Sequence, residues 1–327
     1  MNPAVLVLLA LLPCAILLAY YLRQAPESPE PWTRVGLTAV LGAASVGLAF
    51  PFQQVLAGWW PDSIVLQSFV GFALGEELLK VCAVLLAAPA LMRWDRMSSG
   101  LIYGIAAGLG FAALENLMYV LSFGSGTAVL RAITAVPGHA LHSALVGIQL
   151  GKVHRIDSRS GRIRAVLIGL GLAVLAHGLY DVLLLGEAGG RFGVVPLLAM
   201  EGFIVAHLFR RARAEDLGQA FEMLSKVPVL EDLPAPTMRM LVQRGTRRSV
   251  RSGRQVVRVG APGDALFLVL RGTMTLVRDS IYSTTEITKL RAGHFFGEMA
   301  LVTGSPYRAD VTATSDCLLL RVPRLAL

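Results

Sequence analysis

The sequence is poor in charge and in cysteine. Only 16% of its 327 residues are Asp, Glu, Lys or Arg, whereas globular domains carry about 25%. The deficit lies in residues 1–209, which are almost entirely apolar runs, while residues 210–327 have the composition of a soluble domain. The 3 cysteines form no C-x-x-C pair, which argues against a disulfide framework or a zinc knuckle. The composition therefore predicts two units of different class.

The excess of positive charge does not indicate nucleic acid. A net charge of +8 by itself suggests an acidic partner. The arginines, however, lie in short segments between apolar runs, where a membrane protein carries them. We therefore expect membrane lipid as a partner and no nucleic acid. The sequence leaves open whether copies of the chain associate as a homo-oligomer.

Seven apolar runs approach or exceed the ~20 residues that a membrane span needs. They cover residues 4–22, 35–58, 64–91, 100–122, 129–152, 163–185 and 193–209. The first run lacks the basic start and the cleavage site of a signal peptide, so we interpret it as a span. Arginine is concentrated in alternate loops, and such loops face the cytoplasm. This predicts a multi-pass α-helical membrane domain of about seven spans, with its N-terminus outside and the C-terminal domain in the cytoplasm.

Glycine recurs along one face of the predicted fourth span. Gly100, Gly104 and Gly108 are spaced four residues apart. Small residues at this spacing allow two helix backbones to approach closely. We expect these glycines to serve helix packing, with no chemistry of their own.

Polar side chains interrupt four of the apolar runs. A charge at the centre of a bilayer costs ~2.5–3.5 kcal/mol on insertion scales. The polar residues are Glu76, Glu77 and Lys80 in the third run, Glu115 and Asn116 in the fourth, His139 and His142 in the fifth, and His177 and Asp181 in the sixth. At a helical rise of about 1.5 Å per residue they fall at similar depths. Four antiparallel helices would therefore bring them into one cluster.

Each group alone also has a structural explanation. Glu76 and Lys80, four residues apart, suit a buried ion pair, a histidine such as His142 suits an apolar core, and Asp181 suits an orienting role for His177. The whole set is too costly to be explained in this way. Three uses stay open: amide hydrolysis by a carboxylate-activated water, hydrolysis by a metal-bound water, and a proton or ion pathway. The chain has no H-E-x-x-H, so it is not an ordinary zincin.

Four segments in successive runs carry a family resemblance. They are E-E-x-x-K at 76–80, GFAALEN at 110–116, PGHALHSALVG at 137–147 and AHGLYD at 176–181. In this order they resemble the motifs of the PrsW family of bacterial intramembrane proteases, which is distantly similar to the CAAX-prenyl endoproteases. The resemblance covers about residues 70–185. It implies hydrolysis of peptide bonds in a membrane-bound protein, such as an anti-sigma factor, at the bacterial cytoplasmic membrane.

The resemblance also implies roles by position. The catalytic residues would be Glu76, Glu77, Glu115, His139 and His177, and the supporting residues would be Lys80, Asn116, His142 and Asp181. We favour a glutamic mechanism, in which Glu76 or Glu77 activates the water. The alternative is a metal-dependent protease with the ligands Glu77, Glu115, His139 and His177.

The C-terminal part predicts a small β-jelly-roll. Short strand-like pieces divided by glycine turns are typical of that fold. The six pieces are RQVVRVG, DALFLVLRG, TMTLVRD, TEITKLRAG, ADVTATSD and CLLLRVP. We place its domain at 237–327, behind a helical linker at 210–236 and the membrane protease domain at 1–209. The stretch GHFFGEMALVTGSPYRADVTA, after GAPGDALFLVLRGTMTLV, resembles cyclic-nucleotide-binding domains.

This second resemblance implies a regulatory site for cAMP or cGMP. Glu298 would bind the ribose hydroxyl, Gly297, Met299 and Ala300 would form the phosphate turn, and Arg308 would bind the phosphate. Arg308 stands one place later than in the P-R-x-A pattern of that family, and a one-residue slip reverses the face of a strand. A degenerate domain that binds nothing is the alternative. A nucleotide-gated channel or transporter is a further reading, but no voltage sensor or T-V-G-Y-G-like filter is present.

Overall fold

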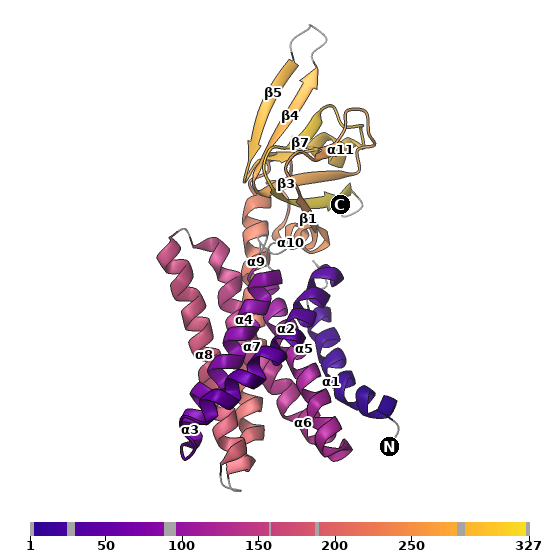
Figure 1. The fold of residues 1–327 in the computed structure, drawn as a ribbon. Coiled ribbons are helices and arrows are strands. Elements are labelled where there is room, and N and C mark those ends of the chain that lie inside the picture. Colours follow the sequence, from indigo (N-terminus) through magenta and orange to yellow (C-terminus); the bar gives the residue numbers. More distant parts are fainter. Residues whose placement is uncertain are drawn as a thin grey trace. The chain divides into compact units, whose positions relative to one another are not determined.

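A computed structural model describes residues 3–24, 30–87, 96–156, 158–186, 190–279 and 285–324. The chain forms two compact units, Met1–Arg213 and Ala214–Leu327. Figure 1 shows that the first unit is helical and that the second is mostly strands. The predicted classes of the two units, a helical membrane region and an antiparallel β domain, are confirmed.

The first unit is built from helices of very different length. They are α1 (Pro3–Arg23), α2 (Trp32–Ala57), α3 (Ile64–Leu66), the π-helix η1 (Gln67–Leu74), α4 (Gly75–Ala87), α5 (Met97–Phe123), α6 (Ser125–Ile133), α7 (Ala135–Lys152), the 3₁₀-helix η3 (Val153–Arg155), α8 (Arg159–Leu185), the 3₁₀-helix η4 (Gly190–Gly193) and α9 (Val194–Leu224). Within the described residues, 5 helices are long and apolar enough to cross a membrane. They are Ala4–Arg23, Trp32–Leu56, Met97–Phe123, Arg159–Leu185 and Gly190–Leu224.

The third and fifth predicted spans are subdivided in the structure. Residues 64–87 form α3, η1 and α4 in direct succession, and residues 125–152 form α6 and α7, which meet at Thr134. These two segments carry the glutamates, the lysine and two of the histidines, which lower their hydropathy. Residues 88–91 of the predicted third span lie outside the described residues. The count of seven spans and the orientation of the termini therefore stay predictions.

Helices α5 and α7 pack backbone against backbone. A Cβ added at Gly100 would lie 2.4 Å from the carbonyl oxygen of Gly147, and one at Gly104 would lie 2.3 Å from that of Ser143. A Cβ added at Gly108 would lie 2.3 Å from the carbonyl oxygen of His139. The predicted packing role of the three glycines is confirmed, because no larger residue fits at this distance.

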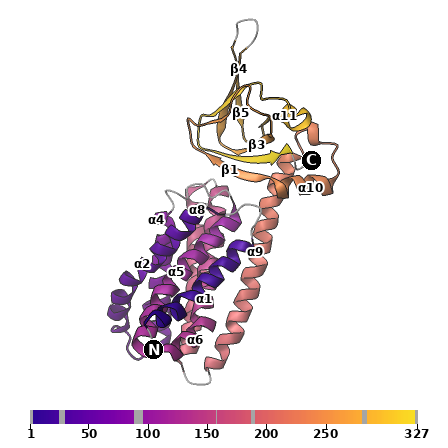
Figure 2. The same ribbon diagram turned by 90° about the vertical axis from the view of Figure 1, so that its right-hand side faces the viewer.

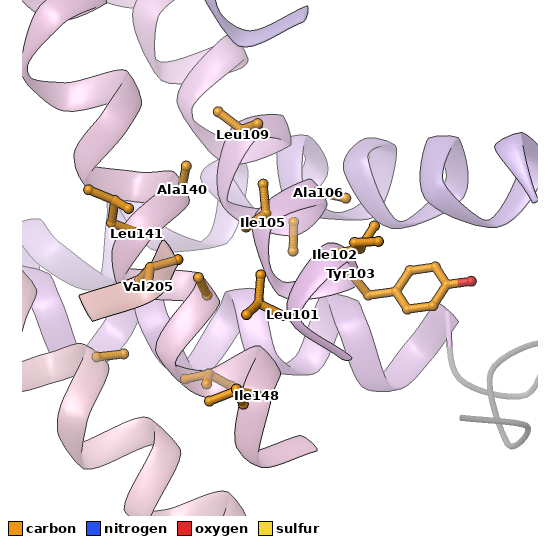
Figure 3. Close-up of a cluster of buried hydrophobic side chains, with 14 of the residues drawn as sticks. Leu101, Ile102, Tyr103, Ile105, Ala106, Leu109, Ala140, Leu141, Ile148 and Val205 are labelled. Carbon is orange, nitrogen blue, oxygen red and sulfur yellow. The ribbon is translucent and has the colours of Figure 1, made fainter. Parts of the chain in front are cut away.

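An apolar core surrounds this contact. Figure 3 shows Leu101, Ile105 and Leu109 of α5 beside Ala140 of α7 and Val205 of α9. All of these side chains are at most 2% exposed, so one face of α9 packs into the core of the first unit. The polar cluster described below lies against the same helices.

The second unit is a pair of antiparallel sheets. Its strands are β1 (Thr246–Val250), β2 (Gln255–Val257), β3 (Ala265–Arg271), β4 (Thr273–Asp279), β5 (Thr285–Arg291), β6 (Phe295–Phe296), β7 (Asp310–Ala313) and β8 (Cys317–Pro323). One sheet has the order β1-β8-β3-β6 and the other β2-β7-β4-β5. Figure 2 shows β4 and β5 as a long hairpin within this unit. The pattern predicted six of these strands and missed β1 and β6, which are polar or very short.

Helices complete the second unit. After α9 come the 3₁₀-helix η5 (Pro228–Leu230) and α10 (Ala235–Arg244), and the short α11 (Glu298–Thr303) follows β6. Leu224, Leu230 and Leu241 form one buried cluster with Leu266 and Leu320 of the strands. The C-terminal end of α9 thus belongs to the core of the second unit.

Candidate active site

The polar residues singled out in the sequence converge in the interior of the first unit. Helix α4 contributes Glu76, Glu77 and Lys80, α5 contributes Glu115 and Asn116, α7 contributes His139 and His142, and α8 contributes His177 and Asp181. All of them are buried except Glu115, whose side chain is 19% exposed. The structure therefore places the whole set in one region between four helices.

An irregular helical segment precedes Glu76 and Glu77. The π-helix η1 ends at Leu74, and Glu76 and Glu77 stand in the first turn of α4. Single π-helical turns within α-helices are frequent at functional sites. Gly178 of α8 allows this segment to come close, because a Cβ there would lie 2.5 Å from Cδ1 of Phe69. The neighbouring His177 is thereby brought within reach of α4.

Lys80 is the cation at the centre of the cluster. Its Nζ lies 2.8 Å from Oε1 of Glu77, 3.2 Å from Oε2 of Glu76 and 2.9 Å from Nδ1 of His139. It also lies 4.3 Å from the ring centre of Phe111. With 1% exposure, this ammonium can remain charged only because both carboxylates compensate its burial.

His139 is fixed by a carboxylate at one ring nitrogen. Its Nε2 lies 2.8 Å from Oε2 of Glu115. Arg131 of α6 holds the same carboxylate oxygen at 2.6 Å. The other nitrogen, Nδ1, faces Lys80 and lies 3.8 Å from Oε2 of Glu76. The Glu115 contact favours the tautomer that carries its proton on Nε2 and leaves Nδ1 as a lone pair.

His177 is held in the same way. Its Nδ1 lies 2.9 Å from Oε1 of Glu77. Its Nε2 lies 3.8 Å from Oε2 of Glu76 and 3.6 Å from Oδ2 of Asp181. Within the described residues, this Asp181 oxygen has no hydrogen-bond partner. One nitrogen of each imidazole is thus bound by a carboxylate, and the other faces the same oxygen of Glu76.

This arrangement has the chemistry of a catalytic metal site. Glu76, His139 and His177 each offer a donor atom, and these atoms lie within 4.8 Å of one another. Two histidines and one carboxylate form a common set of protein ligands for catalytic zinc. A carboxylate behind each ligating imidazole is the usual support, and here Glu115 and Glu77 hold those positions. The residues therefore fit a divalent metal.

This grouping differs from the ligand set considered in the sequence. Glu76 is the carboxylate of the donor set. Glu115 and Glu77 instead bind the opposite ring nitrogens of His139 and His177. A second group of donors, formed by Glu77, His142 and His177, lies equally close together. In that group Oε1 of Glu77 and Nδ1 of His177 already bind each other at 2.9 Å.

A cavity reaches the cluster beside Glu76. It has a volume of about 270 Å³, and helices α2 and α5 line it together with Glu76. Glu115 lines it as well, and Gln53 of α2 donates from Nε2 to Oε1 of Glu76 at 2.6 Å. Glu77 does not line this cavity and borders a void of only about 10 Å³. Of the adjacent glutamates, Glu76 is the one that a substrate can approach.

Three further polar residues of this region were not singled out in the sequence. Gln53 belongs to the second apolar run, and Arg131 stands near the start of the fifth. In the structure Arg131 binds both Glu115 and Asn116, each at 2.6 Å. The third, Glu201 of α9, is a single acid in the last apolar run. Each of the three could have been noticed as a polar residue within an apolar run. The sequence does not show which side chains they contact.

The second unit has a cavity of its own, of about 380 Å³. All five residues predicted for nucleotide binding line it, namely Gly297, Glu298, Met299, Ala300 and Arg308. Gly297 has a φ of 86°, a conformation that favours glycine. It precedes α11, so Glu298 is the first residue of this short helix.

Arg308, which stands one place later than in the P-R-x-A pattern, also lines this cavity. Tyr307, one place earlier, is buried, and its hydroxyl donates to Oδ1 of Asp264 at 2.9 Å. Burial, and then this hydrogen bond, raise the pKa of Tyr307. Arg308 is exposed and lines the cavity. The tyrosine therefore occupies the inward position, and the arginine follows it on the side of the cavity.

Two family models match the chain. The model described as PrsW family intramembrane metalloprotease matches residues 30–208, and the cyclic nucleotide-binding domain model matches residues 247–327. The match of the first covers more than half of the chain. The same two parts also resemble individual relatives.

The membrane unit resembles two curated proteases. It is 26% identical over 211 residues to Protease PrsW of Bacillus subtilis (strain 168), covering 63% of this chain and 95% of that one. It is 32% identical over 180 residues to Protease PrsW of Geobacillus kaustophilus (strain HTA426), covering 54% and 77%.

The second unit resembles other proteins. Over 119 residues the chain is 29% identical to a cyclic nucleotide-gated potassium channel of Mesorhizobium japonicum, covering 36% of this chain and 32% of the channel. A solved cyclic nucleotide-binding-like protein from Brucella abortus is 24% identical, with a TM-score of 0.30, over 32% of this chain and 91% of that one.

Proposed function

Because the chain belongs to the PrsW family of intramembrane metalloproteases, we propose that it hydrolyses peptide bonds of membrane-embedded proteins at the cluster around Glu76. One observation supports the proposal above the others. His139 and His177 each turn the ring nitrogen that is not bound by a carboxylate toward Oε2 of Glu76, at 3.8 Å. Glu76 itself lines a cavity of about 270 Å³ between α2 and α5.

The donor set favours the metal-dependent form of this reaction over the glutamic form that the sequence suggested. Glu76, His139 and His177 would hold the metal. When bound, such an ion polarises the scissile carbonyl and lowers the pKa of a water. Glu77 and Glu115 hold the two imidazoles in one tautomer each. Gln53 fixes the second oxygen of Glu76, so the carboxylate has a single orientation.

In the glutamic form the same residues have different tasks. Oε2 of Glu76 would take a proton from water, whose oxygen attacks the carbonyl carbon. The C–N bond then breaks, and the proton passes to the leaving amine. Lys80 offsets the charge of the two glutamates in either form. Measurement of metal content and chelator sensitivity distinguishes the two forms.

The substrate is identified most directly by proteomics of membranes that contain the wild type or the Glu76→Gln variant. We expect intact membrane-bound proteins to accumulate with the variant, and an anti-sigma factor is the substrate class that the family resemblance suggests. Identical peptide patterns in the two membranes would overturn the proposal.

A second function, regulation by a cyclic nucleotide, is supported by the cavity of the second unit. Its volume of about 380 Å³ is in the range of small-molecule sites. Glu298 offers a carboxylate for ribose hydroxyls, and Arg308 offers a guanidinium for a phosphate. We propose cAMP or cGMP as the ligand, with an effect on proteolysis as the outcome of binding.

A further inference from the structure

A buried acid on α9 has no role in the cluster described so far. Glu201 is 5% exposed, and in the described part of the chain neither of its side-chain oxygens has a hydrogen-bond partner. Nε2 of His142 lies 3.2 Å from Oε2 of Glu201. An acid within a membrane helix is expensive, and such residues commonly serve a function.

His142 connects this acid with the proposed active site. Its ring stacks on the ring of His177, with the centroids 4.9 Å apart and the planes inclined by 25°. It also meets the ring of Tyr180 edge-on at 5.8 Å. Neither nitrogen of His142 has a hydrogen-bond partner among the described residues. Glu201, His142 and His177 therefore form a row of successive contacts.

The row ends at His177, whose ring orientation decides where its Nε2 points. The Nδ1 of His177 is held by Glu77, and the face of its ring is covered by His142. Together these contacts determine where Nε2 points, 3.8 Å from Oε2 of Glu76. If His142 tilts, this face of the His177 ring loses its cover, while the bond to Glu77 remains. The bond fixes one atom of the ring, but it leaves rotation about that bond.

The row begins on a helix that belongs to both units. Leu197, Leu198 and Val205 of α9 are part of the buried core of the first unit. Leu224, at the end of the same helix, is part of a core cluster of the second unit. The boundary between the units falls within α9, after Arg213. A change along α9 would thus reach Glu201 directly.

We infer that Glu201 is a positioning residue for the proposed reaction: through His142 it holds the ring of His177, and it makes catalysis depend on the placement of α9. The inference rests on the proposed function. It explains why a carboxylate, and not an apolar side chain, stands at this position. Oε2 of Glu201 lies 3.2 Å from Nε2 of His142, a polar contact that an aliphatic residue could not make.

The test is steady-state cleavage by the full chain in proteoliposomes, with kcat expressed per active enzyme. Glu201→Gln should lower kcat about tenfold, as loss of an outer contact to a catalytic histidine does, and leave KM unchanged. Glu222→Gln is the matched control, because Glu222 lies on the same helix and is solvent-exposed. It should have the kcat of the wild type.

A double-mutant cycle separates positioning from general stability. His142→Phe keeps a ring against His177 and removes the contact with Glu201. It should lower kcat to a similar degree, and adding Glu201→Gln should lower it no further. Additive effects, or a rise in KM in place of a fall in kcat, would overturn the inference.

The result also separates this inference from the proposed function. A wild-type chain that cleaves nothing overturns the proposed function itself. An active wild type with unchanged kcat in Glu201→Gln overturns only the positioning role. If Glu201→Gln does not accumulate, His142→Phe reports on the same contact, and a wild-type kcat there overturns the inference.

Discussion

Glu76 and Glu77 are neighbours in sequence but have different surroundings. Glu76 lines a cavity of about 270 Å³, and Gln53 and Lys80 bind it. Glu77 is fully buried and is held by Lys80 and His177, with the hydroxyl of Ser143 at 3.3 Å. Because a helix turns by about 100° per residue, adjacent side chains on α4 point to different neighbours. The first contacts the proposed reaction site and the second supports it.

Substitution of these two residues should therefore have different effects. Glu76→Gln should abolish measurable cleavage and lower the midpoint of thermal unfolding less than Glu77→Gln does, because Lys80 keeps its shorter contact with Glu77. Glu77→Gln should reduce cleavage and also lower that midpoint, because loss of one partner from a buried ion pair costs about 3–5 kcal/mol. Cleavage and thermal unfolding in detergent measure both. Equal stability losses in the two variants would contradict the different roles.

Lys80 should be essential for folding as well as for activity. Lys80→Met keeps the length of the side chain and leaves Glu76 and Glu77 without their shared cation. We expect a loss of about 3–5 kcal/mol in unfolding free energy. Lys226→Met is the control, because Lys226 pairs with Glu222 at the surface, where such a pair contributes about 0–1 kcal/mol. Denaturant unfolding gives both values, and similar losses would refute a special role of Lys80.

The glycine contact between α5 and α7 should determine the geometry of the site. Gly108→Ala would place a Cβ 2.3 Å from the carbonyl oxygen of His139, so the helices must separate. We expect a loss of about 1–3 kcal/mol in unfolding free energy, together with reduced cleavage. Gly171→Ala on α8 is the control, since nothing lies within 4 Å of a Cβ there. Unchanged cleavage by Gly108→Ala would show that the spacing of α5 and α7 does not position His139.

Metal removal should abolish activity. The donor set of Glu76, His139 and His177 fits a divalent ion, so the purified full chain should contain close to one such ion. A chelator should stop cleavage, and added Zn²⁺ should restore it. The His177→Ala variant should retain less metal than the wild type by elemental analysis. Full activity in a chain free of metal would favour the glutamic form.

Nucleotide binding should depend on Arg308. We expect calorimetry on the full chain in detergent to show cAMP or cGMP binding. Arg308→Ala should weaken it by about 1.5–3 kcal/mol, the range for a hydrogen bond to a charged group. Arg251→Ala, at an exposed position outside the cavity, should bind as the wild type does. The absence of heat with either nucleotide would support the degenerate alternative.

The sequence alone indicated two units of different class and the polar residues that the structure brings together. Apolar runs of span length can bury their backbone only as helices in lipid, and short strands between glycine turns predict a β-fold. The spacing Gly100, Gly104 and Gly108 predicted a close helix contact for the same local reason. These features depend on periodicity and on backbone freedom, which are properties of neighbouring residues.

Only the tertiary structure decided which side chains meet. Sequence spacing could not show that Glu77 lies behind His177 or that Arg131 reaches Glu115. It also gave no sign that Glu201 contacts His142 from the last helix of the first unit. Each of these contacts joins residues that are distant in the chain or lie on different helices. They depend on how the helices rotate and pack against one another, which local sequence does not determine.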